Sequence, residues 1–371
     1  MRSTDRSRNH TGTPFRRWRY CALLSVALVV AGTMVDVSDA HQAPVHTHQQ
    51  LVPIPKYRAR SGQVVVSLAQ RLITSFDAKA QQAFLFDWDA GERTEWSNLP
   101  AGFFTRPGIS IGEMSDAQRA LLFDFLSASL GEKGYGRLTD VLAAEAFLSQ
   151  APGAERNGWF PENYWISFYG TPSGRDLWGW SFGGHHLALN ISFNKGQIST
   201  ISPSFVGTEP AIFRLDGAEY EAVVDMHRAG HAVYQTLDDD QKEQADAGSV
   251  PGDVQAGPGD DGYIPHRIGM SASEMSAPQR AALLNAIQMW VEIQPERNAA
   301  ARMQEIEAQL DQVHFAWRGT DEVNTPVYMR IQGPTLIIEL VSTGGNVGRN
   351  ARGLGHYHTI YRDPTYEYGR R

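Results

Sequence analysis

Four histidines in two short runs carry the strongest chemical signal in this sequence. His185 and His186 are adjacent, and His356 and His358 are separated by one residue. Neutral imidazole is the commonest metal ligand in proteins, and two or three convergent histidines with one carboxylate form a hydrolytic zinc site that keeps an open position. On a strand, the two rings of an H-x-H pattern point to one side. With Glu339 as ligand or general base, we expect a divalent-metal site such as a zinc site.

Two other interpretations of these residues stay open. His185 could pack in the core with one bonded ring nitrogen, and His356 and His358 could bond to carboxylates such as Asp363. The run Gly179–Gly183 matches the G-x-S-x-G nucleophile motif, with Ser181 as the nucleophile. That motif needs a strand, a sharp turn and a helix, whereas the flanking residues here alternate as in a strand. The three hypotheses are therefore a metal-dependent hydrolase, a non-catalytic protein that binds a small molecule or a metal, and a serine hydrolase.

Residues 178–191 alternate in character, which predicts one continuous strand. One face of that strand would carry Trp178, Trp180, His186 and Asn190. We expect this face to be half open and Trp178, Trp180 and Asn190 to contact a small-molecule substrate. The alternative is that the tryptophans cover a small core beneath a helix layer.

The last part of the chain offers two more candidates. Arg362 is predicted to contact substrate, and Asp363 to act as a catalytic carboxylate. The alternative is an ion pair between them that fixes the last strand.

Three weaker signals favour structural roles. His227 and His231 are four residues apart on an expected helix but lack the glutamate of H-E-x-x-H, so they are interpreted as a helix flank. Residues 252–262, which include Asp253, lack the alternating acidic positions of a calcium loop and are typical of a surface turn. The histidines near the N-terminus lie in a predicted flexible tail: His41, His46 and His48.

A repeated pattern indicates which elements position these residues. Ser115 and Gln118 recur as Ser276 and Gln279 at an offset of 161, and each pair forms a capping box at a helix start. Further on, Gly184, Leu187 and Asn190 match Gly333, Leu336 and Glu339 at an offset of 149. We therefore predict an α+β fold made of two copies of one unit, residues 61–215 and 216–371. Each copy has helices followed by antiparallel strands, and a pseudo-twofold axis would bring His186 and Glu339 towards a shared cleft.

The N-terminal forty residues read as an export signal. Six arginines precede the apolar run 21–30, and Ser38 and Ala40 suit a signal peptidase. We expect cleavage after residue 40, a flexible tail over 41–60, no stable membrane span in the product, and a periplasmic or extracellular location. The alternative is an uncleaved membrane anchor.

Cleavage would change the charge and the chemistry that is available. Without the segment's six Arg and three Asp, the 33 basic and 41 acidic residues of the chain give a net charge of −11. This disfavours nucleic acid and anionic membranes as partners. The single cysteine, Cys21, would be removed, so any metal would be bound by His, Asp or Glu.

Several motifs together resemble the bacterial domain of unknown function 3500 family. They are Trp178-Gly179-Trp180, Gly184-His185-His186-Leu187 with Asn190, the two Glu-Met-Ser helix starts, Arg330 to Thr335 with Glu339, and His356-Tyr357-His358 with Arg362-Asp363-Pro364. The resemblance runs from about Leu68 to the C-terminus and implies export but no activity. Residues 341–355 depart from it, with a Gly- and Arg-rich stretch in place of Asn and Asp.

Overall fold

The computed structural model describes residues 57, 62–259, 261–344 and 355–369. The predicted signal peptide and the tail histidines His41, His46 and His48 lie outside the described residues, as does most of the Gly- and Arg-rich stretch. All described residues belong to one unit, residues 46–371.

A mixed sheet of twelve strands is the centre of this unit. Its order is β1-β3-β4-β5-β7-β14-β13-β12-β11-β10, with β2 paired to β3 and β6 paired to β5. All pairs are antiparallel except β1 with β3. The strands are β1 (Leu85–Phe86), β2 (Ile109–Ser110), β3 (Tyr164–Tyr169), β4 (Trp178–Gly184), β5 (Leu187–Asn194), β6 (Gln197–Thr200), β7 (Ser204–Thr208), β10 (Met270–Ser271), β11 (His314–Arg318), β12 (Pro326–Gly333), β13 (Leu336–Thr343) and β14 (Tyr357–Arg362). A separate hairpin follows β7 and consists of β8 (Ile212–Leu215) and β9 (Ala218–Glu221).

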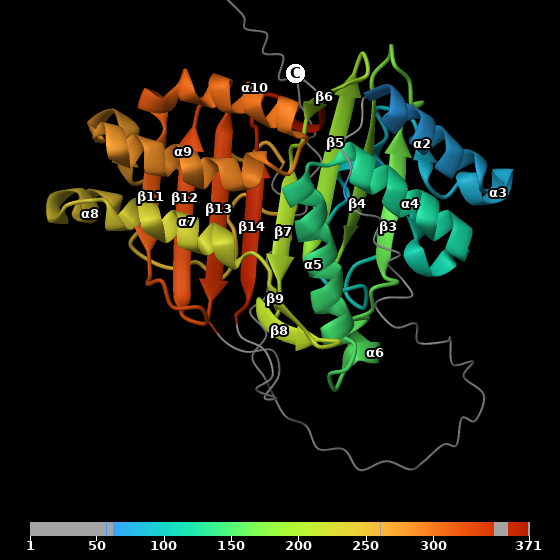
Figure 1. Ribbon diagram of the computed structural model, residues 1–371, viewed down its shortest axis with the longest axis horizontal. Helices are drawn as coiled ribbons and strands as arrows, with labels where there is room; N and C mark the ends of the chain where they lie inside the picture. Colours follow the sequence, from blue (N-terminus) through green and yellow to red (C-terminus); the bar gives the residue numbers. More distant parts are fainter. Residues whose placement is uncertain (1–56, 58–61, 260, 345–354, 370–371) are drawn as a thin grey trace, which may run out of the picture. The chain divides into compact units, whose positions relative to one another are not determined.

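Helices cover one face of this sheet, as Figure 1 shows. They are α2 (Gly62–Thr74), α3 (Ala78–Gln81), α4 (Asp116–Ser129), α5 (Glu132–Leu148), α6 (Ala154–Asn157), α7 (Val224–Gln235), α8 (Asp239–Ala245), α9 (Ala277–Val291) and α10 (Glu296–Glu307). Short 3-10 turns lie at η1 (Gly91–Thr94), η2 (Ile111–Glu113), η3 (Ala272–Glu274), η4 (Leu310–Gln312) and η5 (Glu367–Gly369). The α+β class is therefore confirmed.

Both predicted capping boxes are confirmed. Ser115 and Gln118 begin α4, and Ser276 and Gln279 begin α9. In each case the two side chains satisfy backbone N–H groups that the first helical turn leaves without partners. The same two residue types therefore begin one helix in each half of the chain.

The prediction of one continuous strand over residues 178–191 is wrong. The chain reverses at His185 and His186, so β4 and β5 form a hairpin in which Gly184 pairs with Leu187. In one continuous strand Gly184 and Leu187 would point to opposite faces, whereas in the hairpin they are paired directly and share a face. The alternation of side chains after the turn is therefore shifted by one residue. Trp180 therefore lies on the same face as Leu189 and Ile191, not with His186 and Asn190.

The helix-covered face is apolar, and the expected half-open tryptophan surface is not present. Trp178 and Trp180 are 0% and 1% exposed. Trp178 stacks on Phe193 with ring centroids 4.3 Å apart, and Trp180 meets Phe125 of α4 edge-on. Both side chains cover a core beneath helices, which was the alternative interpretation.

The opposite face of the sheet is covered by connecting segments. Trp96, Val254 and Tyr368 pack there against Phe205 and Ile360 of the central strands. His358 is on this face, because it lies two residues from Ile360 on the same strand. We call this the loop face of the sheet.

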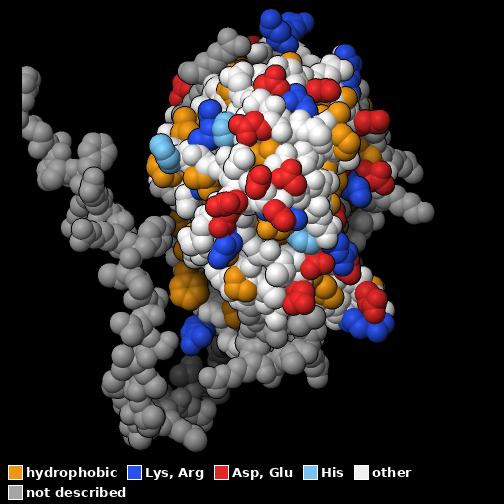
Figure 2. Space-filling view, turned by 90° about the vertical axis from the view of Figure 1, so that its left-hand side faces the viewer, with side chains coloured by type: hydrophobic (Ala, Val, Ile, Leu, Met, Phe, Trp, Pro, Cys, Tyr) orange, Lys and Arg blue, Asp and Glu red, His pale blue; other side chains and the backbone are white. Residues whose placement is uncertain are grey.

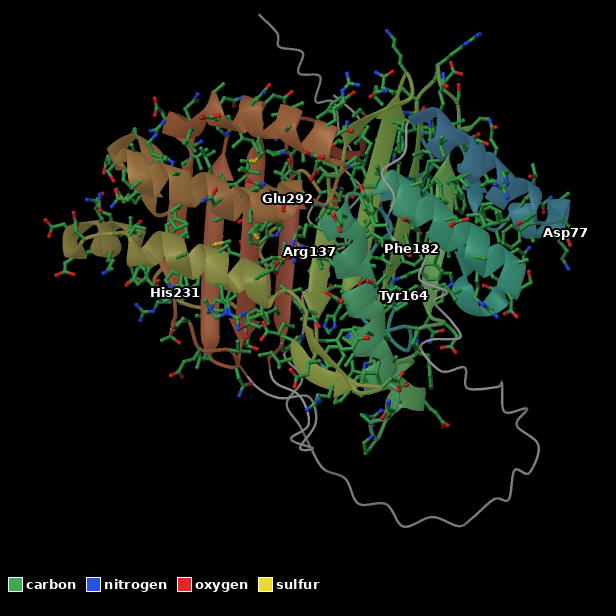
Figure 3. All side chains as sticks on the ribbon, in the orientation of Figure 1. Asp77, Arg137, Tyr164, Phe182, His231 and Glu292 are labelled. Atoms are coloured by element: carbon green, nitrogen blue, oxygen red, sulfur yellow. The ribbon has the colours of Figure 1, made fainter. Side chains whose placement is uncertain are left out.

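The helix layer also joins the two halves of the sheet. Arg137 of α5, labelled in Figure 3, donates to the Asp225 carboxylate of α7 at 2.8 Å and to the Met289 carbonyl oxygen of α9 at 3.3 Å. None of the helices in the described part of the chain has the length and apolar character to cross a membrane. On the face seen in Figure 2, acidic and basic side chains are interspersed.

Candidate metal centre

Three histidines from distant parts of the chain converge at the end of the central strands. His186 comes from the β4–β5 turn, His356 directly precedes β14, and His358 is the second residue of β14. The Nε2 atom of His356 lies 3.2 Å from Nε2 of His186 and 3.0 Å from Nε2 of His358. These three residues form a group in which one ring nitrogen each could bind a common ion. The structure thus brings together three of the four predicted metal ligands.

The nitrogen spacing fits a single divalent ion. Zinc binds imidazole nitrogen at about 2.0–2.1 Å, so two ligands of a tetrahedral site are about 3.3–3.4 Å apart. Ligands at a right angle are about 2.9 Å apart for the same bond length. The observed 3.0 and 3.2 Å lie between these values.

Backbone hydrogen bonds hold His186 in a conformation that non-glycine residues rarely adopt. Its φ is 62°, in the left-handed region, where strain is of order 1–3 kcal/mol. Its N–H donates to the Asn98 carbonyl oxygen at 3.1 Å, and its carbonyl oxygen accepts from the Gly207 N–H at 2.7 Å. Its ring stacks on that of His185 with centroids 3.7 Å apart. Such local strain is typical of functional sites.

Gly207 leaves room for the His358 ring. A Cβ at this position would lie 2.7 Å from the Tyr357 carbonyl oxygen and 3.2 Å from Cδ2 of His358. Gly207 is also paired with His358 across β7 and β14. A side chain here would displace the ring that the site requires.

Carboxylates face the Nδ1 atoms on the outer side of the cluster. Asp253 Oδ1 lies 2.7 Å from Nδ1 of His358, and Glu209 Oε1 lies 3.9 Å from Nδ1 of His356. A ring that donates from Nδ1 to a carboxylate presents the Nε2 lone pair on its other side, which is the usual arrangement around protein-bound metals. The predicted partner Asp363 lies elsewhere.

The electrostatics keep His186 and His356 neutral. Burial and the neighbouring rings of His185, His356 and His358 lower the pKa of His186 well below its usual value. Burial and the neighbouring His358 likewise lower the pKa of His356 to about 3. Burial alone would raise the pKa of Asp253, but the hydrogen bond and charge of His358, the Val254 N–H and the charge of His356 together outweigh it, so that this pKa is lowered. Neutral rings with an ionised acceptor behind them are suited to bind a cation.

His185, the fourth predicted ligand, belongs to a different pair. Its Nδ1 lies 2.9 Å from Oε2 of Glu145 on α5, and both side chains are buried. Its carbonyl oxygen accepts from the Tyr164 hydroxyl at 2.6 Å, beneath α5 in Figure 3. This is the core role that was left open for His185, and it supports His186 through ring stacking.

The structure does not bring Glu339 to the histidines. Its carboxylate is fully buried and accepts from the Tyr328 hydroxyl, from Nε of Arg330 at 3.2 Å and from the Ala256 N–H at 2.7 Å. Both of its oxygens therefore accept hydrogen bonds within the protein. Glu339 is absent from the metal group found among the described residues.

Arg362 and Asp363 lie at the other end of β14. Arg362 contacts Asp261 and Glu367, and Asp363 lies 3.2 Å from Arg302 of α10. The predicted pair between Arg362 and Asp363 is thus replaced by partners from other segments. Asn190, also buried, donates to the Pro203 carbonyl oxygen at 3.0 Å.

Ser181 lacks the geometry of a nucleophile. It lies in the middle of β4, paired with Ser167 and Asn190, so no helix follows it. Its hydroxyl lies 3.2 Å from that of Tyr169. The strand–turn–helix that exposes a catalytic serine does not occur here.

Two supporting carboxylates were missed in the sequence. Asp253 was placed in a surface turn, and Glu209 was not singled out. Both act through contacts with residues about 100 or more positions away, so local pattern carried no signal for them. The only hint was the clustering of Asp253, Asp260 and Asp261 in a Gly-rich segment, which places acidic groups on a loop.

Comparison with known proteins gives a family but no activity. A family model described as a protein of unknown function (DUF3500) matches residues 58–370. No curated protein and no solved structure matches the chain.

Proposed function

Since the chain belongs to the DUF3500 family, a protein family of unknown function, its function must be inferred from its site, and we propose that it is a divalent-metal-dependent hydrolase. The metal, zinc in the first instance, would be held by Nε2 of His186, His356 and His358. The remaining coordination position would be left for water or substrate.

One observation carries this proposal: the three Nε2 atoms face each other rather than protein partners. In a protein without a metal role, buried ring nitrogens bond to hydroxyl groups, carbonyl groups or carboxylates. Here Asp253 accepts a hydrogen bond from Nδ1–H of His358, which leaves the Nε2 lone pair of the neutral ring directed at His356. The donor set is three neutral imidazoles with carboxylates behind two of them, a set that suits zinc.

The residues of the chain would each perform a defined task. When bound, a zinc ion lowers the pKa of a coordinated water towards neutrality and polarises a substrate oxygen. Asp253 holds the ring of His358 by a hydrogen bond from behind, and the carboxylate of Glu209 faces Nδ1 of His356 at 3.9 Å. The side chain of His356 is 31% exposed, which gives solvent a path to the site. Because the three ligands are neutral, the site would favour an anionic or polar fourth ligand.

Metal analysis of the purified protein tests the proposal. We expect about one zinc per chain after zinc loading, and its loss in His186→Ala and in His358→Ala. Zinc far below one per chain in the wild type, or zinc that both variants retain, would rule out the site.

Activity measurements separate the hydrolase from the second hypothesis, a non-catalytic binding protein. We expect chelator-sensitive hydrolysis of chromogenic ester or phosphoester substrates that returns on zinc addition. Stoichiometric zinc without turnover on any of them favours metal binding alone. A serine-directed fluorophosphonate should label neither the wild type nor Ser181→Ala.

We also infer that the fold arose by duplication, with copies near 61–215 and 216–371. The two capping boxes and the central antiparallel pair of β7 with β14 support this. So does the matched strand order outwards from that pair, β7-β5-β4-β3 on one side and β14-β13-β12-β11 on the other. A superposition of residues 109–208 on 270–362 tests it, and strands that fail to overlay would refute it.

Export to the periplasm or the medium is a further proposal. It is supported by the arginine-rich start and the apolar run 21–30. Cell fractionation with N-terminal sequencing tests it, with a mature start at His41 expected. Recovery of the protein with an intact N-terminus inside the cell would contradict it.

A further inference from the structure

The segment 253–256 lies across the loop face and is held by three neighbouring strands. Asp253 contacts His358 of β14, the Ala256 N–H donates to Glu339 of β13, and Gln255 accepts from Arg330 of β12 at 2.5 Å. A stretch of four residues is thus held by one side chain from each of three strands. Its first residue is the carboxylate behind a proposed metal ligand.

Apolar packing fixes the same segment. Val254 is 7% exposed and belongs to a cluster with Tyr328, Val341 and Ile360 on the loop face. Ala256 is fully buried. Asp253, whose side chain is 47% exposed, and Gln255, which is also exposed, lie at the edge of this contact.

The buried charges beneath the segment require an explanation. Arg330 and Glu339 are 2% and 0% exposed, and a buried ion pair gives little net stability because both charges lose their hydration. Apart from the Tyr328 hydroxyl on β12, their other hydrogen-bond partners belong to the connecting segments. Arg330 donates to Gln255 and to the His266 carbonyl oxygen, and Glu339 accepts from Ala256. The pair therefore fixes the position of the chain that crosses it.

We propose that Glu339 and Arg330 are positioning residues of the metal centre, which act through Ala256, Gln255 and Asp253 on the orientation of His358. This inference rests on the proposed metal site and adds to it a route by which a buried ion pair controls metal affinity. Glu339, predicted from the sequence as a ligand or base, would then serve the site without touching it.

The decisive variant is Glu339→Gln. Both carboxylate oxygens of Glu339 accept hydrogen bonds, one from Ala256 and the other from Arg330 and Tyr328. An amide has one oxygen, so its NH₂ group must face a donor on one side, and one of the two contacts is lost. The side-chain volume is almost unchanged, so the surrounding core is kept.

The experiment is a double-mutant cycle on zinc affinity, measured with the full chain by competition with a chromophoric chelator. We expect Asp253→Asn to weaken zinc binding by roughly 10- to 100-fold, the usual effect of a lost outer carboxylate. Glu339→Gln is expected to weaken it by about 10-fold. If Glu339 acts through Asp253, the double variant binds no more weakly than Asp253→Asn alone.

Three results would overturn the inference. They are unchanged zinc affinity in Glu339→Gln, strictly additive losses in the double variant, and a wild type that binds no zinc. The last result also removes the proposed function, whereas the first two leave it in place.

Two further variants separate an effect on zinc affinity from a general loss of folding stability. Asp225→Asn makes the same chemical change at the partner of buried Arg137 in the helix layer, and it should leave zinc affinity unchanged. Gln255→Ala removes the acceptor for Arg330 with little risk to the fold, and a several-fold loss of affinity is expected. Equal effects of Asp225→Asn and Glu339→Gln would show a general stability effect and refute the positioning role.

Discussion

Histidines lie on both faces of β14, and the two groups differ in what their ring nitrogens contact. On the helix side, His227 of α7 is fully buried, accepts at Nδ1 from the Tyr357 hydroxyl at 2.8 Å and donates from Nε2 to the Thr320 carbonyl oxygen at 2.8 Å. On the loop face, His356 and His358 turn their Nε2 atoms towards each other and His186. Tyr357, which separates the two ligands in sequence, is the partner of the structural histidine.

This difference teaches how to distinguish a structural histidine from a ligand. Burial does not distinguish them, since His227 and His186 are both buried. The distinction is whether both ring nitrogens have protein partners, as in His227, or whether one lone pair from each of several rings is directed at a common point. The spacing of four residues between His227 and His231 resembles a zinc motif. His231, however, packs against Trp317 with ring centroids 5.6 Å apart, and neither histidine belongs to the metal group found among the described residues.

The largest expected effect is the loss of zinc in His356→Ala. Structural zinc binding of about 10–16 kcal/mol over four ligands gives about 2.5–4 kcal/mol per ligand, so zinc affinity should fall by roughly 100- to 1000-fold. The free energy of unfolding without metal should change little, because the side chain is 31% exposed. Chelator competition and urea unfolding measure the two quantities. A His356→Ala variant that loses stability but keeps its zinc affinity would show that His356 is a structural histidine and not a ligand.

His227→Ala should give the opposite result. It leaves a cavity and removes the partners of the Tyr357 hydroxyl and the Thr320 carbonyl, so the free energy of unfolding should fall by about 2–3 kcal/mol. Zinc affinity at a temperature where the variant is folded should match the wild type. Loss of zinc from the folded variant would contradict the structural role of His227 and indicate that it contributes to the metal site.

The smallest expected effect is a pH dependence at His227. Burial lowers the pKa of His227 below its usual value near 6.5, and the hydrogen bond to Thr320 offsets only part of this. The unfolded chain therefore takes up the proton first, and the stabilisation present above pH 6.5 is lost as the pH falls below it. Between pH 7 and 5.5 the metal-free wild type should lose more of its free energy of unfolding than His227→Gln does, as measured by urea unfolding at each pH. Parallel curves would mean that folding does not change the pKa of His227.

The sequence predicted the helix starts and the H-x-H geometry because both depend on local spacing. Ser115 with Gln118 and His356 with His358 act within three residues, where the period of a helix or strand decides the outcome. The β4–β5 turn was missed because His185 and His186 include neither glycine nor asparagine, so the alternation seemed to continue through it. That one missed turn placed Trp178 and Trp180 on the wrong face.

The supporting contacts could not be read from the sequence. Asp253 reaches His358 across 105 positions, and Glu339 is held by Ala256 across 83. Such contacts depend on how a connecting segment crosses a sheet, and residue types alone do not specify that path. The predicted residues were therefore good guides to the ligands and poor guides to what orients them.

The distance along the chain between the ligands has a consequence for how the protein unfolds. His186 and His356 are 170 residues apart, and the chain's single cysteine allows no disulfide within it. An ion held by both would be a reversible cross-link that closes a very long loop, and such a link restricts the unfolded chain more than a short one does. It forms only after β7 and β14 have paired, so it would slow unfolding much more than it speeds folding. Zinc would then set the lifetime of the native state, and the protein would last longest where the metal is supplied.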